Sequence, residues 1–263
     1  HYDTARLREE YLVTNLMVAD EINMVYSMFD RIIAGGAVPV KEELVLEAPE
    51  ILRAEWFTQR RELGIINVGG DGIVKVGDEE YVIPHKEAIY VGRGNRHVSF
   101  RSLDPEHPAH FYFNSATAHR ETGVKQVSKK DAVVMHCGSL EESNERTINR
   151  LLVKEVVPCC QLQMGMTELA PGSTWNTMPA HTHDRRMEVY FYFDLAEGAA
   201  VCHFMGEPQE TRHIWMSNEQ AVISPQWSIH SACATRNYTF IWGMCGENDD
   251  YGDMDWCATE NLR

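Results

Sequence analysis

Side chains that commonly bind divalent metal ions gather in two short segments of the second half of the chain. His181 and His183 are two residues apart, and Glu188 follows five residues after His183. A third histidine, His230, ends the later segment Pro-Gln-Trp-Ser-Ile-His. Three imidazoles and one carboxylate can each approach a cation to roughly 2.0–2.2 Å, and first-row transition metals accept this ligand set. The residue types and their spacing therefore predict a metal centre.

The spacing also indicates which elements must position these ligands. Residues i and i+2 of a β-strand point to the same face, so His181 and His183 can converge on one point inside a barrel. Glu188 has the opposite parity in an uninterrupted strand, and a bulge or tight turn through residues 184–187 is therefore expected. The alternative is that two strand histidines and a surface glutamate happen to lie close together and bind no metal.

The composition is that of a folded protein rather than of a disordered or membrane-inserted chain. Of the 263 residues, 44% are hydrophobic, and there is neither a run of about 18 apolar residues nor a charged-then-apolar leader. The net charge of −15, from 39 acidic and 24 basic residues, argues against nucleic acids and anionic membranes as partners. An anionic ligand would therefore need a local positive centre. The seven cysteines include no C-x-x-C pair, which favours reduced thiols in a cytoplasmic protein.

Most of the chain reads as short strands separated by turn residues. Residues 3–13 are typical of a short helix capped by Asp3 or Thr4, and apolar stretches alternate with glycine-rich turns after it. Many short strands at fairly regular intervals predict an antiparallel β-sandwich or barrel. The polar residues 125–150 indicate a linker that could hold a helical turn.

An internal repeat relates the two halves of the chain. Residues 87–97 align without gaps with residues 220–230. Residues 59–61 align with residues 184–186, and a longer connection separates the two motifs in the second copy. The repeat predicts two domains with the same strand framework.

Only the second copy of the repeat has the complete ligand set. In the first copy, three of the four ligand positions are occupied by Trp56, Thr58 and Leu63, and only His97 keeps a ligand type. The first copy is therefore interpreted as a structural or interface domain without metal. Because the framework does not require the ligands, their presence in the second copy favours a functional role.

The motif pair H-x-H-x4-E and P-x4-H resembles the paired motifs of the cupin superfamily, which line the mouth of a small β-barrel. The chain departs from that pattern at Trp227, where cupins usually have glycine, and at Ala234, where they usually have asparagine. Longer segments are similar to the 4-deoxy-L-threo-5-hexosulose-uronate ketol-isomerase family, also called 5-keto-4-deoxyuronate isomerases. The resemblance covers nearly the whole chain, and its most specific segments are residues 31–36, 60–67, 175–179, 185–193 and 206–213.

The resemblance implies an all-β bicupin, with two antiparallel, jelly-roll-like β-barrel domains and a short N-terminal helix. The expected divisions are a helical arm at 1–22, a barrel without metal at 23–124, a linker at 125–150, a metal-binding barrel at 151–246 and a tail at 247–263. Family members are usually cytoplasmic homohexamers with zinc in the C-terminal barrel. On this chain, the resemblance assigns one Zn²⁺ per subunit to His181, His183, Glu188 and His230.

The activity implied by the resemblance is an aldose–ketose isomerisation of a small acidic sugar from pectin breakdown. The substrate 5-dehydro-4-deoxy-D-glucuronate would become 3-deoxy-D-glycero-2,5-hexodiulosonate as the carbonyl moves from C1 to C2. Proton abstraction beside a carbonyl needs a stabilised enediolate, and a divalent metal can supply the stabilising charge. This activity fits a chain that has no sign of nucleic-acid or membrane binding.

Several residues near the ligands are candidates for substrate contact or catalysis. Arg185 and Arg186 could hold the substrate carboxylate, although salt bridges that support the turn would explain them equally well. Trp227 could form an apolar wall over the sugar, or it could only fill the space where cupins have glycine. Tyr190 and Tyr192 share strand parity with the metal-binding glutamate and could act as hydrogen-bond donors or proton shuttles, with core packing as the alternative.

The sequence does not identify the general base. Metal-bound hydroxide, a tyrosine, Glu62, Glu168 or Glu247 would each serve, and a hydride shift would need no base. Two other functions stay open, namely a cupin dioxygenase that binds iron with the same ligands and a non-catalytic uronate-binding bicupin. Metal content, oxygen consumption and turnover would distinguish these three functions.

Overall fold

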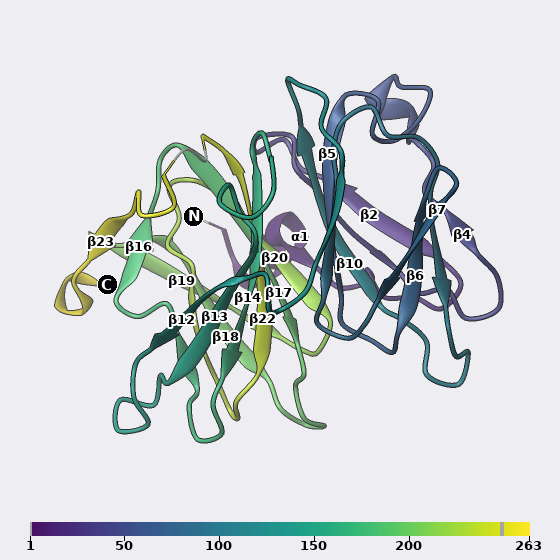
Figure 1. Ribbon diagram of the computed structural model, residues 1–263. Coiled ribbons are helices and arrows are strands. Elements are labelled where there is room, and N and C mark those ends of the chain that lie inside the picture. The colour runs from purple at the N-terminus through teal and green to yellow at the C-terminus, as the bar shows by residue number, and fades with distance from the viewer. Residues whose placement is uncertain (1, 248–249) are drawn as a thin grey trace. The chain divides into compact units, whose positions relative to one another are not determined.

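The computed structural model describes residues 2–247 and 250–263, and strands dominate it (Figure 1). The described residues contain one α-helix, α1 (Thr4–Tyr11). The side chain of Asp3 accepts a hydrogen bond from the backbone N–H of Arg6 at 2.9 Å and caps this helix. The predicted all-β class with a short N-terminal helix is confirmed. No helix in the described part of the chain is long and apolar enough to cross a membrane.

The chain folds into two compact units, and each of them is discontinuous in the sequence. The first unit comprises His1–Thr14, Val134–Asn149 and Gly165–Arg263, and the second comprises Asn15–Val133 and Arg150–Met164. These boundaries differ from the continuous divisions expected from the sequence, because the chain passes between the two units more than once.

Residues 125–150, which were expected to form a linker, contain strands. They include most of β11 (Val124–Val127), all of β12 (Val133–Cys137) and the start of β13 (Arg146–Leu152). β12 lies at the edge of a seven-stranded sheet, and most of its side chains are exposed. The polar composition that suggested a linker is therefore that of an exposed edge strand.

A six-stranded and a four-stranded antiparallel sheet form the second unit. The strand orders are β11-β8-β5-β10-β3-β2 and β4-β9-β6-β7. The other elements of this unit are β2 (Ile22–Tyr26), β3 (Ile33–Ala37), β4 (Leu44–Val45), η1 (Glu50–Leu52), β5 (Arg61–Asn67), β6 (Gly72–Val76), β7 (Glu79–Ile83), β8 (Ala88–Val91), β9 (Val98–Ser102) and β10 (Phe111–Thr117). Side chains from both sheets, including Phe100 and Phe113, form one buried hydrophobic core. Aromatic packing thus fills the interior of this unit.

The first unit is built around a seven-stranded sheet with the order β1-β20-β17-β22-β14-β13-β12. A four-stranded sheet, β15-β21-β18-β19, and the pair β16-β23 complete it. Its other elements are β1 (Leu12–Val13), β14 (Leu162–Leu169), β15 (Trp175–Asn176), β16 (Ala180–Thr182), β17 (Arg186–Phe193), β18 (Val201–Glu207), β19 (Glu210–Met216), β20 (Gln220–Ser224), β21 (Ser231–Ala234), β22 (Thr239–Gly246), β23 (Asp255–Cys257) and η2 (Thr259–Asn261). β17 pairs with β20 on one side and with β22 on the other, which fixes its direction and register.

The strand register agrees with the internal repeat of the sequence. In the second unit, Leu63 of β5 pairs with Val91 of β8. In the first unit, Glu188 of β17 pairs with Ser224 of β20. The sequence alignment equates these same positions. The counterpart of Glu188 in the second unit is therefore a fully buried leucine.

Candidate metal centre

The four predicted ligands lie on neighbouring elements of the first unit. His181 is in β16, and His183 directly follows that strand. Glu188 is in β17, and His230 directly precedes β21. The residues between β16 and β17 form a turn, in which the backbone N–H of Arg186 donates to the carbonyl of His183 at 3.4 Å. The sequence predicted this turn, because Glu188 would face away from the two histidines in an uninterrupted strand.

The ligand atoms of the four side chains converge on one point. All four residues are buried, and their ligand atoms lie within 4.8 Å of one another. Nε2 of His230 is 2.9 Å from Nε2 of His181 and 3.0 Å from Oε2 of Glu188. Nε2 of His183 is 3.1 Å from the same carboxylate oxygen. Adjacent ligands at roughly 2.0–2.2 Å from one cation are roughly 2.8–3.6 Å apart, for angles between a right angle and the tetrahedral angle. The donor set and its spacing therefore fit one metal ion.

Hydrogen bonds to backbone carbonyls orient two of the imidazoles. Nδ1 of His183 donates to the carbonyl of Arg186 at 2.8 Å, and Nδ1 of His230 donates to the carbonyl of Ser228 at 3.4 Å. A carbonyl can only accept, so these bonds place a ring proton on Nδ1 and direct Nε2 at the centre. The Nε2 lone pairs then face the carboxylate of Glu188, an arrangement that a cation between them stabilises.

Burial and mutual proximity set the protonation states of the ligands. Burial, followed by the nearby His230, lowers the pKa of His181 to about 2. Burial by itself raises the pKa of Glu188, but His230 and His183 more than offset this effect and hold the pKa below its usual range. A neutral imidazole and an ionised carboxylate are the forms that bind a metal ion.

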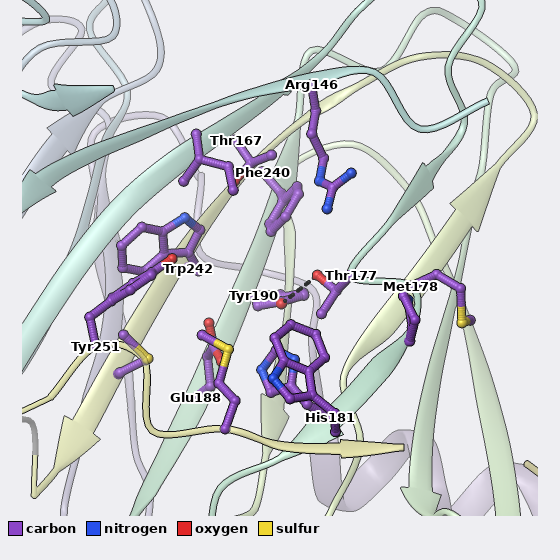
Figure 2. Close-up of a pocket in the computed structure, with 15 residues that line it drawn as sticks. Arg146, Thr167, Thr177, Met178, His181, Glu188, Tyr190, Phe240, Trp242 and Tyr251 are labelled. Atoms are coloured by element: carbon purple, nitrogen blue, oxygen red, sulfur yellow. Dashed lines mark hydrogen bonds between the residues drawn. The ribbon is translucent and has the colours of Figure 1, made fainter. Parts of the chain in front are cut away.

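A cavity of about 200 Å³ adjoins the four candidate metal ligands (Figure 2). Of the four ligands, His181 and Glu188 line it. The other described residues that line it are Arg146, Ile148, Thr167, Thr177, Met178, Pro179, Tyr190, Phe240, Trp242, Met244, Tyr251, Met254 and Trp256. A metal ion in this centre would face a cavity instead of being closed off by protein, as is typical of catalytic sites.

The structure places the two candidate tyrosines differently. Tyr190 lines the cavity, and its hydroxyl is 3.1 Å from Oγ1 of Thr177 (Figure 2). Burial and the charge of Glu188 raise the pKa of Tyr190 well above its ordinary value, so the hydroxyl keeps its proton. Tyr192 is buried with its hydroxyl 2.8 Å from Nδ1 of His203, and it is not among the described residues that line the cavity. Tyr190 can therefore donate a hydrogen bond to a bound molecule, whereas Tyr192 is a core residue.

Arg185 and Arg186 attach the C-terminal segment to the start of β17. The guanidinium of Arg186 is buried and donates to the backbone carbonyls of Asp250, Tyr251 and Asp253 at 2.8, 3.0 and 3.2 Å. Nε of Arg185 donates to the carboxylate of Asp253 at 2.8 Å. Neither arginine is among the described residues that line the cavity. This placement favours the supporting role, which the sequence left open as the alternative to holding a substrate carboxylate.

The apolar wall beside the metal ligands comes from Trp256 and not from Trp227. Trp227 is 43% exposed and lines a different pocket. Trp256 of β23 pairs with His181 of β16, and the centres of their rings are 5.1 Å apart. Residues 247–263, expected to be a tail, thus contribute to the cavity wall. In the sequence, the aromatic residues Tyr251 and Trp256 within this polar segment were the feature that could have indicated its contact with the cavity.

The carboxylates considered as general bases lie elsewhere. Glu62, Glu168 and Glu247 are not among the described residues that line the cavity. Glu62 belongs to the second unit, where its carboxylate accepts hydrogen bonds from backbone N–H groups. Glu168 accepts a hydrogen bond from an asparagine side chain at 3.0 Å. Among the described lining residues, Glu188 is the only carboxylate.

Comparison with protein families and with named proteins shows which proteins this chain resembles over its whole length. The model of the KduI/IolB family matches residues 11–258. A 4-deoxy-L-threo-5-hexosulose-uronate ketol-isomerase from Bacteroides fragilis is 61% identical over 262 residues, which cover 100% of this chain and 94% of that protein. Proteins of the same name from Formosa agariphila and Yersinia enterocolitica are 58% and 53% identical, and the matches cover 94% and 95% of their lengths.

Solved structures show the same architecture at low sequence identity. An IolB-like protein from Salmonella typhimurium superposes with a TM-score of 0.76 at 15% identity, and the match covers 96% of this chain and 97% of that one. An oxalate decarboxylase from Lactobacillus farciminis superposes with a TM-score of 0.57 at 11% identity, over 89% of this chain and 87% of that one. At these identities the likeness establishes a shared fold.

Proposed function

The chain belongs to the KduI/IolB family and is a ketol-isomerase, and we propose that it acts on 4-deoxy-L-threo-5-hexosulose uronate. This compound is also named 5-dehydro-4-deoxy-D-glucuronate, and the proposed product is 3-deoxy-D-glycero-2,5-hexodiulosonate. Relatives with this substrate in their names, at 53–61% identity over 99–100% of the chain, support the assignment.

The observation that carries the proposal is the buried group of three histidines and one glutamate beside a cavity. We infer that the group binds one zinc ion per chain, because nitrogen and oxygen ligands of this kind suit zinc. The resemblance to a family whose members hold zinc in this barrel supports the same choice of metal.

The proposed reaction moves a hydrogen from C2 to C1 and a proton from O2 to O1 of the open-chain sugar. The C1 aldehyde thereby becomes a hydroxymethyl group, and C2 becomes a ketone. A bound divalent cation would supply positive charge that stabilises the negative charge developing on these oxygens. Tyr190 keeps its proton and lines the cavity, so it can donate a hydrogen bond to one of the same oxygens. Thr177 can then donate to the Tyr190 hydroxyl and orient it.

Large apolar side chains would limit the access of water to the reacting carbons, and two of them, Trp242 and Met244, are buried. Trp242, Met244, Met254 and Trp256 line the cavity together with the metal ligands. Exclusion of water strengthens electrostatic interactions with the developing charge and protects an enediolate from side reactions. The cavity therefore combines a charged end with apolar walls, as an isomerisation of this kind requires.

The test is elemental analysis of the purified protein combined with an NMR assay on the fresh product of a pectate lyase. We expect about one zinc per chain and loss of the C1 aldehyde signal without oxygen consumption. Protein that holds stoichiometric zinc and leaves the aldehyde signal unchanged would contradict the isomerase activity. Iron content with oxygen uptake would favour a dioxygenase, and binding of the uronate without turnover would favour a non-catalytic bicupin.

The resemblance also supports proposals about the setting of the enzyme. We propose that it works in cytoplasmic uronate catabolism as a homohexamer. Light scattering would then give a mass six times that of the 30.0 kDa chain. A stable monomer or dimer at working concentration would refute the hexamer without affecting the proposed activity.

A further inference from the structure

Among the described residues that line the cavity, Arg146 is the only one with a cationic side chain, and it lies at a distance from the candidate metal ligands. It is the first residue of β13 and is half-buried. Figure 2 shows its guanidinium pointing into the cavity from the end opposite to His181 and Glu188, with Tyr190 between the two ends. The two ends of the cavity thus carry different chemistry, a metal centre at one and a guanidinium at the other.

The charge of Arg146 has no carboxylate partner in the described part of the chain. Its Nη1 donates to the backbone carbonyl of Asn144 at 2.8 Å, and this bond uses one of the five N–H donors of a guanidinium. By contrast, Arg150 on the same strand and Arg212 on β19 form ion pairs with glutamates. In a chain of net charge −15, a half-buried arginine without a carboxylate is unusual. An anionic ligand in the cavity would provide the missing partner.

The shape of an acceptable ligand follows from this arrangement. The guanidinium fork binds a carboxylate through two parallel hydrogen bonds. Between the two ends, Tyr190 and Thr177 offer hydroxyl groups, while Phe240 offers an apolar wall. The cavity therefore fits a short polyhydroxylated chain with a carboxylate at one end and a reactive carbonyl at the other.

We propose that Arg146 binds the carboxylate of the substrate and thereby places the C1–C2 end of the sugar beside His181 and Glu188. This inference rests on the proposed function and adds the residue that selects for a uronate. Because C6 and C1 are at opposite ends of the open chain, holding the carboxylate at Arg146 directs the carbonyl end to the metal centre. The same contact discriminates against neutral sugars, which would leave the guanidinium without a partner.

The experiment compares wild type with Arg146→Gln and Arg146→Lys on two substrates, the uronate and an analogue whose C6 carboxylate is reduced to an alcohol. For Arg146→Gln we expect a rise in KM for the uronate of roughly 10- to 100-fold, since a charge-assisted bidentate contact is lost. Arg146→Lys keeps the charge but loses the fork, and it should recover part of the loss. On the neutral analogue, wild type and Arg146→Gln should have similar kcat/KM.

Controls separate this inference from the proposed function. Arg212→Gln removes a partly exposed arginine that pairs with Glu210 at 2.7 Å and is not among the described cavity-lining residues, so it should behave as wild type. Metal content should be unchanged in both Arg146 variants. The role of Arg146 would be overturned if Arg146→Gln lowered kcat/KM by the same factor on the uronate and on the neutral analogue. It would also be overturned if the variant kept the wild-type kcat/KM on the uronate. Absence of turnover in wild type would instead refute the proposed function.

Discussion

Replacement of Arg186 by methionine should release the C-terminal segment, residues 250–263, from β16 and β17 while leaving the rest of the first unit folded. The three hydrogen bonds from its guanidinium end on the backbone carbonyls of Asp250, Tyr251 and Asp253. These residues are partly or fully exposed, so water can replace the lost donors, and each bond should contribute about 1 kcal/mol. The sum of about 3 kcal/mol corresponds to an increase of roughly 10²-fold in opening of the segment.

Hydrogen exchange followed by mass spectrometry measures this opening directly. In Arg186→Met, the amides of β23, which pair with β16, should lose roughly 10²-fold in protection. Because Trp256 and Tyr251 line the cavity, kcat/KM should fall as well. Unchanged protection of β23 would refute the account of Arg186 as the attachment of this segment.

The internal repeat provides a matched control for this variant. Arg61 occupies the corresponding position of the second unit, where its buried guanidinium donates to the carbonyls of Ser115 and Arg31 at 2.7 and 2.6 Å. Arg61→Met should therefore destabilise the second unit and leave exchange at β23 unchanged. Equal loss of protection at β23 in both variants would show that the effect is general destabilisation.

Three further outcomes follow from the site. Tyr190→Phe should lower kcat by roughly 10²-fold with unchanged metal content, because a hydrogen-bond donor to a developing oxyanion is lost, and steady-state kinetics that show an unchanged kcat would contradict this role. Burial lowers the pKa of His203 to about 3, so the unfolded state binds its proton first, and the contribution of the neutral ring to stability is complete above pH 6.5 and declines as the pH falls toward 3. The free energy of unfolding, measured with urea at pH 7 and pH 5, should therefore differ less between the two pH values for His203→Gln than for wild type. An equal difference in both proteins would refute the low pKa of His203. Removal of the metal by a chelator should lower the Tm in a calorimetric scan, since the ion binds only the folded protein, and an unchanged Tm would count against occupancy of the centre.

The convergence of the four candidate metal ligands was predictable because it depends on short-range rules. Strand parity placed His181 and His183 on one face, and the parity of Glu188 required a turn, which the structure shows between β16 and β17. The repeat then indicated which strands carry the site, and strand pairing reproduces the alignment of Leu63 with Glu188.

The cavity wall was less predictable because it depends on contacts between distant parts of the chain. β23 is far from β16 in the sequence, and residues 247–263 have no periodic pattern that indicates a buried strand. The two adjacent arginines had the right chemistry for a carboxylate, but their positions at the start of β17 direct them to the C-terminal segment. Arg146 lies in a polar stretch interpreted as a linker, so its position in the cavity could not be anticipated.

A zinc titration of metal-free protein, with the C1-aldehyde NMR assay at each step, tests whether the isomerase activity depends on one zinc ion. Activity should rise in proportion to zinc and saturate at one ion per chain. His230→Ala, which removes a buried candidate ligand, should gain neither tight zinc binding nor activity. Full activity in protein shown to be metal-free, or in His230→Ala without zinc, would refute a zinc-dependent isomerase.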